Sequence, residues 1–589
     1  MKKNKILYNT SYCIKYIWKI DSKYILLMII ISVLTSIFNV VNLSILRYIT
    51  DTLMEQKIKC FLVVILVMFL LSITIAVING SASYLYEPLL QNRIIETIQK
   101  DIYKKAKSFN LEDYENKKFY ELYYFVVENG KTGIINSVTL TMGGLTSLLS
   151  VIGISSIIIQ YDLVIITCTF VGVFISCLCS MKIKKLQYTY KIESIPYNRE
   201  ISYIHRIYYL NDYIKEILTF CNSGIFKKKY EYAWKGMNKL TLKWGKRIRI
   251  QYIWLMVADS FVEIIILIYL GYNTMSGKML LGEFIVVYTG IQQMIQQIKA
   301  IVASVPELYS NALELEKYFE FMQMKSDKGK IVVKSIDEIR FENVFFSYGT
   351  DRNILQNVSF TLKKNNGKIA IVGKNGSGKS SIIKLLMGFY ENYEGKISIN
   401  GRNLCELSKG DYRKRISVLY QDFRLFSMTV DQNVSMEYES SEEKVNEFLK
   451  KVKVYEKIKS LPDQNRTILS KEFDKDGIYL SGGEQQKIGL ARSLFRNSDV
   501  LILDEPFSNM DCISIDSILK EIENVYLDKI IILITHDLHN LYGIDRILLL
   551  DNGQIVEDGT EKELLSKRGQ YYQMWKRANT KEEETNERL

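Results

Sequence analysis

The sequence predicts a chain of two parts: an all-α membrane half with six spanning helices, fused to a soluble α/β half of the P-loop type. Three observations predict it. Residues 24–302 carry several long apolar runs, whereas residues 330–589 alternate short apolar segments with charged stretches. In the second part, a glycine-rich loop at Gly373–Ser380 follows an apolar strand and opens a helix.

Six segments of about 20 mainly apolar residues are long enough to cross a bilayer. They are Tyr24–Leu46, Cys60–Asn79, Ser137–Gln160, Leu163–Met181, Tyr252–Met275 and Leu281–Val302. Lysines gather before the first segment and after the fourth, as they do on cytoplasmic membrane flanks. These flanks explain the net charge of +12, so we expect membrane lipid, and not nucleic acid, as a partner.

Two connections between the spans, residues 80–136 and 182–251, are long, charged and poor in Pro and Gly. Structureless loops of this length are uncommon, so we predict helices that leave the membrane on the cytoplasmic side and return. The turns at their tips are expected at Leu111–Tyr120 and Asn211–Phe220, where they would touch a soluble partner. The basic N-terminus runs straight into the first span and shows no cleavable signal.

The loop Gly373–Ser380 reads GKNGSGKS and fits the phosphate-binding pattern G-x-x-x-x-G-K-[ST]. Its glycines let backbone N–H groups close around phosphates. We expect Lys379 to reach the outer phosphates of ATP and the Ser380 hydroxyl to coordinate Mg²⁺. The predicted ATP-binding residues here are Gly373, Lys374, Asn375, Gly376, Ser377, Gly378, Lys379, Ser380 and Ser381.

Two carboxylates follow an apolar strand at Val500–Pro506, which reads VLILDEP. Asp504 suits the shell of Mg²⁺, a hard cation that prefers oxygen ligands. Glu505 is placed to polarise the water that attacks the γ-phosphate. The strand therefore predicts ATP hydrolysis in addition to ATP binding.

The segment Leu480–Gln486 reads LSGGEQQ and resembles the signature of ATP-binding cassette (ABC) proteins. A hydroxyl and backbone N–H groups at a helix start suit an anion. The resemblance covers nearly the whole chain, which looks like a half-transporter of the ABC exporter type, an ATPase coupled to transport. It adds these ATP-binding residues: Ser481, Gly482, Gly483, Glu484 and Asp511.

The resemblance also implies roles for single residues. Tyr348 would stack on adenine, and His536 would contact the γ-phosphate. Gln421 would join Mg²⁺ and the attacking water and communicate with the membrane half. Two departures are visible: Glu484 stands where such exporters more often have Gln, and the loop SNMD replaces the commoner SALD but keeps Asp511.

The resemblance implies four regions and two chains. Residues 1–323 form the transmembrane domain, 324–338 a linker, 339–575 the nucleotide-binding domain and 576–589 a charged tail, which we expect to be disordered from Lys581. In this family each ATP lies between the phosphate loop of one domain and the signature of another. Because all parts are intact here, we expect a homodimer with two active sites, with a homologous half-transporter as the alternative partner.

Polar residues inside the predicted spans indicate a substrate path. Asp259 and Glu263 lie four apart on one helical face, where intramembrane acids usually line a cavity and would attract a cationic substrate. The alternative is pairing with Arg247, Arg249 or a loop lysine. The sixth span carries a polar run that suggests a water-filled path or a dimer interface: Gln292, Gln293, Gln296, Gln297 and Lys299.

The tyrosine-rich stretch of residues 194–220 resembles bacterial exporters of ribosomally made peptides, such as nisin-type lantibiotic transporters. We therefore expect export of a peptide across the bacterial plasma membrane by alternating access, with the nucleotide-binding domain in the cytoplasm. We expect no leader cleavage by the chain, because no cysteine-peptidase domain precedes the first span. A multidrug or lipid exporter (flippase) is the alternative. A channel or receptor that uses ATP only as a gate is kept as a further hypothesis.

Overall fold

The computed structural model describes residues 2–586 apart from residues 162, 221–222, 325–328, 350–352, 365–367, 473, 509, 511, 526–528, 539–540 and 542. Contacts between residues divide the chain into two compact units. The first comprises Met1–Lys107 and Glu121–Met324, and the second comprises Ser108–Tyr120 and Lys325–Leu589. The tip of the first long connection therefore groups with the C-terminal part of the chain.

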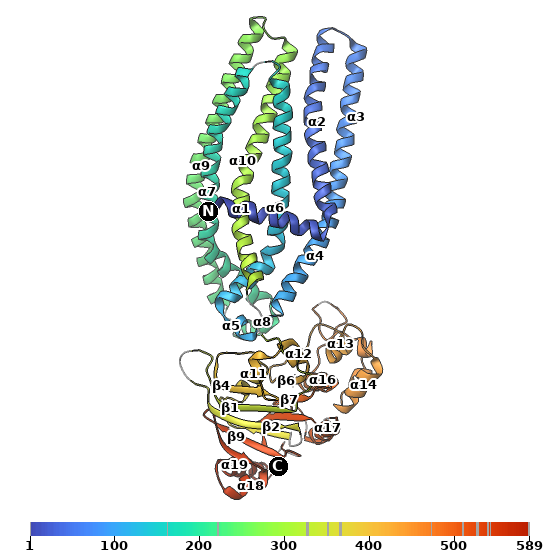
Figure 1. Ribbon diagram of the computed structural model, residues 1–589, viewed down its shortest axis with the longest axis vertical. Helices are drawn as coiled ribbons and strands as arrows, with labels where there is room; N and C mark the ends of the chain where they lie inside the picture. The colour runs from blue at the N-terminus through green and yellow to red at the C-terminus, as the bar shows by residue number, and fades with distance from the viewer. Residues whose placement is uncertain are drawn as a thin grey trace. The chain divides into compact units, whose positions relative to one another are not determined.

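The first unit is helical throughout its described residues, as predicted. Its elements are α1 (Lys2–Ile20), α2 (Ser22–Met54), α3 (Ile58–Ser81), a π-helical turn η1 (Ala82–Tyr86), α4 (Glu87–Ala106), α6 (Lys117–Ile158), α7 (Leu163–Tyr209), α8 (Asn211–Phe220), α9 (Ser223–Met275) and α10 (Leu281–Gln323). Figure 1 shows the long helices of this unit running alongside one another.

Long helices stand at all six predicted spans. Four stretches are both long and apolar enough to cross a membrane: α2, the continuous helical stretch Ile58–Ala106, α6 and most of α9. Helices α7 and α10 lie at the fourth and sixth predicted spans and fall outside this criterion over their described residues. In α10 the glutamines and Lys299 lower the apolar content. The unit therefore crosses the membrane several times, and six crossings stay a prediction.

Helix α1 is a feature that the sequence analysis missed, because it treated the basic N-terminus as the start of the first span. The chain breaks at Asp21, whose carboxylate accepts a hydrogen bond from the Lys23 N–H at 3.0 Å and caps α2. Helix α1 lies crosswise to α2 in Figure 1. It buries Cys13 and Ile17, one turn apart, so one face packs on the unit.

The two predicted tips differ in how closely they match the structure. Helix α8 begins and ends where the second tip was predicted, at Asn211–Phe220. The first tip is a single turn, α5 (Leu111–Glu115), followed by a break at the extended residue Asn116 before α6 begins. Asn110 opens α5, and its N–H donates to Asp113 Oδ2 at 2.9 Å, which closes a capping box.

The second unit is the predicted α/β half and contains two sheets. One is antiparallel, in the order β2–β1–β4–β5, with β1 (Glu338–Phe346), β2 (Leu355–Lys363), β4 (Tyr393–Ile399) and β5 (Arg402–Asn403). The other has the order β10–β9–β3–β8–β7–β6, with β3 (Lys368–Val372), β6 (Ile416–Leu419), β7 (Val500–Asp504), β8 (Ile530–Thr535), β9 (Arg546–Asp551) and β10 (Gln554–Gly559). Only β10 runs antiparallel in the second sheet.

Strands β7 and β8 are buried along their full length, and β3 is buried apart from Lys368, as continuous apolar runs predict for a sheet covered on both faces. Val372 pairs with Thr535, and Asp504 pairs with Ile534. The carboxyl ends of β3, β7 and β8 therefore meet at one edge. The helices of the unit are α11 (Lys379–Leu386), α12 (Lys409–Lys414), α13 (Val430–Ser435), α14 (Glu442–Lys451), α15 (Tyr455–Lys459), α16 (Gly482–Phe495), α17 (Cys512–Val525), α18 (Glu561–Lys567) and α19 (Gln570–Asn586).

Within the predicted linker, the N–H groups of Lys330 and Ile331 both donate to the Glu406 carbonyl at 3.1 Å, so this part contacts the second unit. The expectation of disorder from Lys581 was wrong within the described residues, since α19 continues to Asn586. Lys and Glu make up four of the six residues 581–586 and are good helix formers, which outweighs the lack of apolar residues there.

Candidate active site

The phosphate loop is built on two glycines with left-handed backbones. Gly376 has φ +82° and Gly378 has φ +107°, the latter at the start of α11. A Cβ on Gly378 would lie 2.7 Å from the Leu355 side chain, so only glycine fits without a shift. The loop can therefore fold its N–H groups around an anion at the N-terminus of α11.

Lys379 and Ser377 prepare this loop for phosphate. The Lys379 ammonium donates to the carbonyls of Gly373 at 2.7 Å and Lys374 at 3.0 Å, and only 6% of the residue is exposed. Burial lowers the pKa of Lys379, although the nearby carboxylates of Glu505 and Asp504 oppose that shift. The Ser377 hydroxyl is buried without a hydrogen-bond partner among the described residues. An anionic ligand would satisfy both groups.

Ser380 and Asp504 bring two oxygens together at the same edge. The Ser380 hydroxyl donates to Asp504 Oδ2 at 3.1 Å. Asp504 is only 4% exposed, and this burial raises its pKa to about 6; Glu505 adds to the rise, whereas the Ser380 hydrogen bond and Lys379 oppose it. A buried pair of oxygen donors fits a hard divalent cation, whose charge would favour the ionised carboxylate.

Glu505 holds its carboxylate between two side chains that follow the ends of β6 and β8. Its Oε2 accepts a hydrogen bond from the Gln421 amide at 2.6 Å, and its Oε1 lies 3.0 Å from His536 Nδ1. The backbone is left-handed, with φ +48°, and is fixed by the Glu505 N–H donating to the Ile534 carbonyl at 2.9 Å. Such a conformation costs about 1–3 kcal/mol and persists where the surroundings enforce it, which aims this carboxylate in one direction.

Tyr348 lies at the side of the loop. Its ring packs against Phe346 and Tyr390, with centroid distances of 4.9 and 5.2 Å, and the Lys384 ammonium lies 4.9 Å from its centroid. Its hydroxyl is hydrogen-bonded to Ser381 Oγ at 3.1 Å. The ring is 42% exposed, so an aromatic surface beside the phosphate loop is open to a planar ligand.

The signature segment forms the start of α16. Ser481 caps the helix, and its N–H donates to Glu484 Oε2 at 2.8 Å. Burial would raise the pKa of Glu484, but the hydrogen bonds from Ser481 and the nearby Lys457 outweigh it and lower that pKa. Glu484 thus completes a capping box, which accounts for a carboxylate at this position. In the described part of the chain, no hydrogen bond or ion pair joins residues 481–484 to residues 373–381.

The structure brings together most of the predicted hydrolysis residues and leaves others apart. The loop 373–381, Asp504 and Glu505 meet Gln421 and His536 at one sheet edge, while residues 481–484 stand apart from the loop. Asp511 lies outside the described residues. Sequence reasoning missed Gln486, whose amide donates to the Glu505 carbonyl at 3.1 Å and to Ser508 Oγ at 3.2 Å. Its position two residues after Glu484 was the available signal.

The first unit holds a second polar cluster, inside the predicted spans. Asp259 accepts from the Lys299 ammonium at 2.6 Å and from the Ser176 hydroxyl at 2.5 Å. The expected alternative partners, Arg247, Arg249 or a loop lysine, were wrong: the cation comes from α10, one helix away. Sequence reasoning saw both residues but did not pair them.

Glu263 lies one turn from Asp259 and has neutral partners. Its Oε1 accepts from the Tyr288 hydroxyl at 2.6 Å and from the Gln292 amide at 2.9 Å. A small cavity of about 50 Å³ lies among Gly172, Ser176, Asp259, Val262, Glu263, Gln292, Ile295 and Lys299. Gln293, Gln296 and Gln297 are not part of its lining. The side-chain oxygen of Gln293 is buried without a partner among the described residues.

Comparisons with known proteins bear on both units. Residues 355–508 match the family model described as ABC transporter. The chain is 28% identical over 568 residues to the subtilin transport ATP-binding protein SpaT of Bacillus subtilis, which covers 94% of this chain and 91% of that protein. It is 30% identical over 369 residues to the ATP-dependent lipid A-core flippase of Photobacterium profundum, covering 61% of this chain and 62% of that protein, less than two thirds of its length.

The fold also matches a solved structure. A bacterial Atm1-family ABC exporter with ATP bound aligns with a TM-score of 0.78 at 20% identity, over 94% of this chain and 97% of that chain. The fold and the site together define a P-loop ATPase fused to a helical membrane half. The matched domain, the relatives and the fold together support an ABC exporter, a multi-pass membrane protein whose ATP binding and hydrolysis are coupled to transport.

Proposed function

We propose that the chain exports a peptide across the bacterial plasma membrane by alternating access, as a homodimer driven by ATP hydrolysis. The observation that carries the hydrolysis is the Glu505 carboxylate, held between Gln421 and His536 beside the Ser380–Asp504 pair. The similarity over 94% of the chain to a subtilin transport protein supports a peptide as cargo. The nucleotide-binding domain then faces the cytoplasm.

Each residue of the site has a chemical task in hydrolysis. Glu505 accepts a proton from the attacking water, and Gln421 and His536 keep its two oxygens oriented. Lys379 supplies positive charge to the transferred phosphate. Ser380 and Asp504, with Gln421, would hold Mg²⁺, which when bound neutralises charge on the phosphates.

A second chain is needed to complete each site. Glu484 contacts Ser481 and Lys457, and no hydrogen bond or ion pair among the described residues joins residues 481–484 to the phosphate loop of the same chain. Paired with the loop of another copy, Ser481 and the N–H groups of Gly482 and Gly483 would close over the phosphates. Because the catalytic residues are all present, two copies make two working sites; a homologous half-transporter is the alternative partner. Asp511 is proposed to contact the nucleotide across this interface.

The substrate path is proposed to run by Asp259 and Glu263. Asp259, Glu263 and Lys299 sum to one negative charge, and Glu263 is met by neutral donors. Carboxylates within a membrane span are costly and seek a cation, which favours a cationic peptide. Gln293, Gln296 and Gln297 lie on α10, the helix that carries Lys299, where we propose a path or an interface between copies.

A lipid exporter is the second candidate, favoured by the 30% identity to a lipid A-core flippase. Lipid also borders the protein in either case, because side chains such as Leu62, Leu66 and Phe69 on α3 are more than half exposed. We keep the domain boundaries at residues 1–323, 324–338, 339–575 and 576–589 as part of the proposal.

The test is uptake into inside-out membrane vesicles that contain the chain. Three labelled probes are compared: subtilin, the cationic dye rhodamine 123 and a fluorescent phosphatidylethanolamine. Peptide accumulation that requires ATP and is lost in Lys379→Ala supports the proposal. ATP-dependent movement of the lipid or the dye with no peptide uptake supports the alternative and overturns the peptide assignment.

A further inference from the structure

The turn after the phosphate-loop helix carries the tip segment 108–120 of the second unit. Helix α11 starts at Lys379 and ends at Leu386, and the turn runs from there to β4. The N–H of Glu112 donates to the Phe389 carbonyl at 3.3 Å, and the N–H of Glu391 donates to Glu112 Oε2 at 3.2 Å. Helix α5 therefore lies on the far end of the helix whose first residue binds phosphate.

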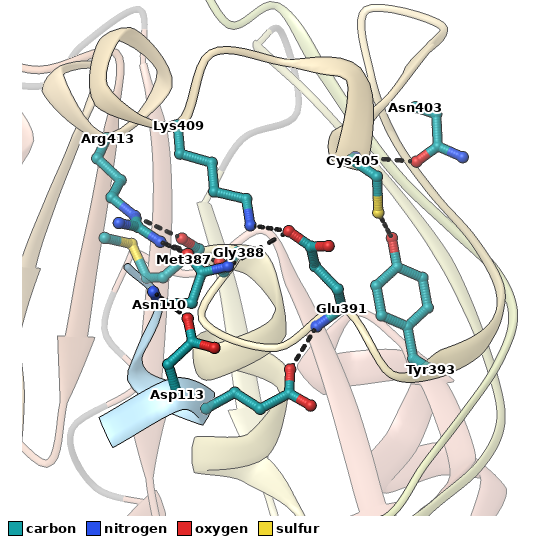
Figure 2. A network of polar contacts seen from close by, with 11 residues as sticks. Asn110, Asp113, Met387, Gly388, Glu391, Tyr393, Asn403, Cys405, Lys409 and Arg413 are labelled. Carbon is teal, nitrogen blue, oxygen red and sulfur yellow. Dashed lines mark hydrogen bonds and ion pairs between the residues drawn. The ribbon is translucent and has the colours of Figure 1, made fainter. Parts of the chain in front are cut away.

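Arg413 forms hydrogen bonds both to the turn after α11 and to Asn110 at the start of α5, as Figure 2 shows. Its Nε donates to the Met387 carbonyl at 3.0 Å, and its Nη2 donates to the Gly388 carbonyl at 2.9 Å and to Asn110 Oδ1 at 3.1 Å. Its guanidinium also lies 5.0 Å from the centroid of the Phe389 ring. One planar fork thus joins the two carbonyls that follow α11 to the residue that opens α5.

Two neighbours of Arg413 on α12 bond the same region. Lys409 is only 3% exposed and pairs with Glu391, which accepts from the Asn110 amide at 3.3 Å. The Tyr412 hydroxyl donates to the Leu386 carbonyl at 2.8 Å. Helix α12 therefore supplies three side chains to this region, and Arg413 bonds both the turn after α11 and Asn110, the residue that opens α5.

We propose that Arg413 is a positioning residue that transmits the position of the phosphate-loop helix to the tip segment 108–120. The inference rests on the proposed function, because it requires that ATP binding displaces α11. A helix of two turns moves as a rigid piece, so a shift at Lys379 reappears at the carbonyls of Met387 and Gly388. The guanidinium holds those carbonyls and Asn110 at once, which a lysine ammonium cannot do in one plane.

This route is separate from the one expected for Gln421. It starts at the opposite end of α11 from the phosphates, and Glu505, which bonds Gln421, takes no part in it. Loss of Arg413 should therefore uncouple the tip segment while leaving the hydrolysis residues in place. That combination distinguishes positioning from a general structural role.

The experiment measures motion and hydrolysis in the same samples. The full chain, with its eight cysteines replaced, carries one spin label at Ser276 and is placed in lipid nanodiscs. Pulsed electron paramagnetic resonance records the distance between the labels of two copies, without nucleotide and with MgATP and vanadate. The variants are Arg413→Lys, Asn110→Ala and their combination; Lys414→Ala on the same helix is the control, because its side chain is 73% exposed and bonds Asp411.

We expect the wild type and Lys414→Ala to shift in distance with MgATP and vanadate. In Arg413→Lys the ratio of shifted to unshifted molecules should fall about tenfold, the loss that one hydrogen bond to a charged group allows, while the KM for ATP and basal hydrolysis stay near wild type. In the double variant, the ratio of shifted to unshifted molecules should fall no further than in either single variant.

A full shift in Arg413→Lys overturns the inference. A lost shift accompanied by an equal loss of ATP affinity also overturns it, since Arg413 would then support the nucleotide site itself. No shift in the wild type would overturn the proposed function, and the Arg413 inference with it.

Discussion

Replacing Glu505 by glutamine removes the charge of the carboxylate and keeps its shape. In the wild type, the carboxylate accepts from the Gln421 amide at 2.6 Å and lies 3.0 Å from His536 Nδ1. In the variant, the remaining oxygen can still accept from Gln421, and the new amide group faces His536 Nδ1. The site should therefore keep its geometry and its affinity for ATP. What disappears is the proton acceptor for the attacking water.

A positioned general base contributes about 10²- to 10⁴-fold to a rate. We therefore expect kcat for ATP hydrolysis to fall by that factor, which corresponds to about 3–5 kcal/mol of transition-state stabilisation. The removed charge also lies beside Asp504, whose pKa it raises, so that pKa should move down in the variant. The closed, ATP-bound dimer should accumulate because hydrolysis no longer opens it.

The assay is steady-state phosphate release together with ATP binding on the purified chain. Glu437→Gln, at an exposed glutamate of the same unit, is the matched control and should hydrolyse ATP like the wild type. Hydrolysis in Glu505→Gln within tenfold of the wild-type rate would refute the assignment of the water-activating residue.

Three further predictions follow from the same contacts. Lys379→Ala should weaken ATP binding about tenfold or more, measured by equilibrium titration, and unchanged affinity would remove the phosphate role of this ammonium. Without nucleotide, Asp504→Asn should stabilise the chain at pH 7.5 by up to about 3 kcal/mol, because folding raises the Asp504 pKa from 3.8 to about 6 and stability therefore falls as pH rises between these values. Thermal unfolding should show that the stability gained by Asp504→Asn over the wild type shrinks below pH 6. A gain at pH 5 equal to that at pH 7.5 would contradict this prediction. Lys299→Gln should raise the apparent affinity for a cationic peptide in vesicle uptake, because Asp259 loses its internal partner, and lower affinity would show that the pair is needed intact.

The α/β half was predictable because local patterns carry it. Continuous apolar runs indicate the strands of a buried parallel sheet, and the phosphate-loop motif occurs between a strand and a helix. Since parallel strands end at one edge, Ser380, Asp504 and Glu505 had to meet there. The left-handed backbone of Glu505 was not predictable, because it depends on the Ile534 carbonyl from a neighbouring strand.

Contacts between segments far apart in the chain could not be predicted from the sequence. The pair of Asp259 and Lys299 joins two helices, and nothing in either helix alone specifies the partner. The grouping of residues 108–120 with the second unit rests on contacts between residues far apart in the chain, such as Asn110 with Arg413 and Glu112 with Glu391. The break that makes α1 a separate helix depends on Asp21, a single residue within an otherwise helical pattern.

The central claim is that ATP hydrolysis in this chain drives a peptide uphill across a membrane. The most direct measurement is accumulation of labelled subtilin in proteoliposomes that hold the purified chain with its nucleotide-binding domains outside. The account predicts concentration above the external level with MgATP, and none with a non-hydrolysable analogue or with Glu505→Gln. Uptake that only equilibrates the peptide, or that proceeds equally with the analogue, would contradict it and indicate a channel gated by ATP.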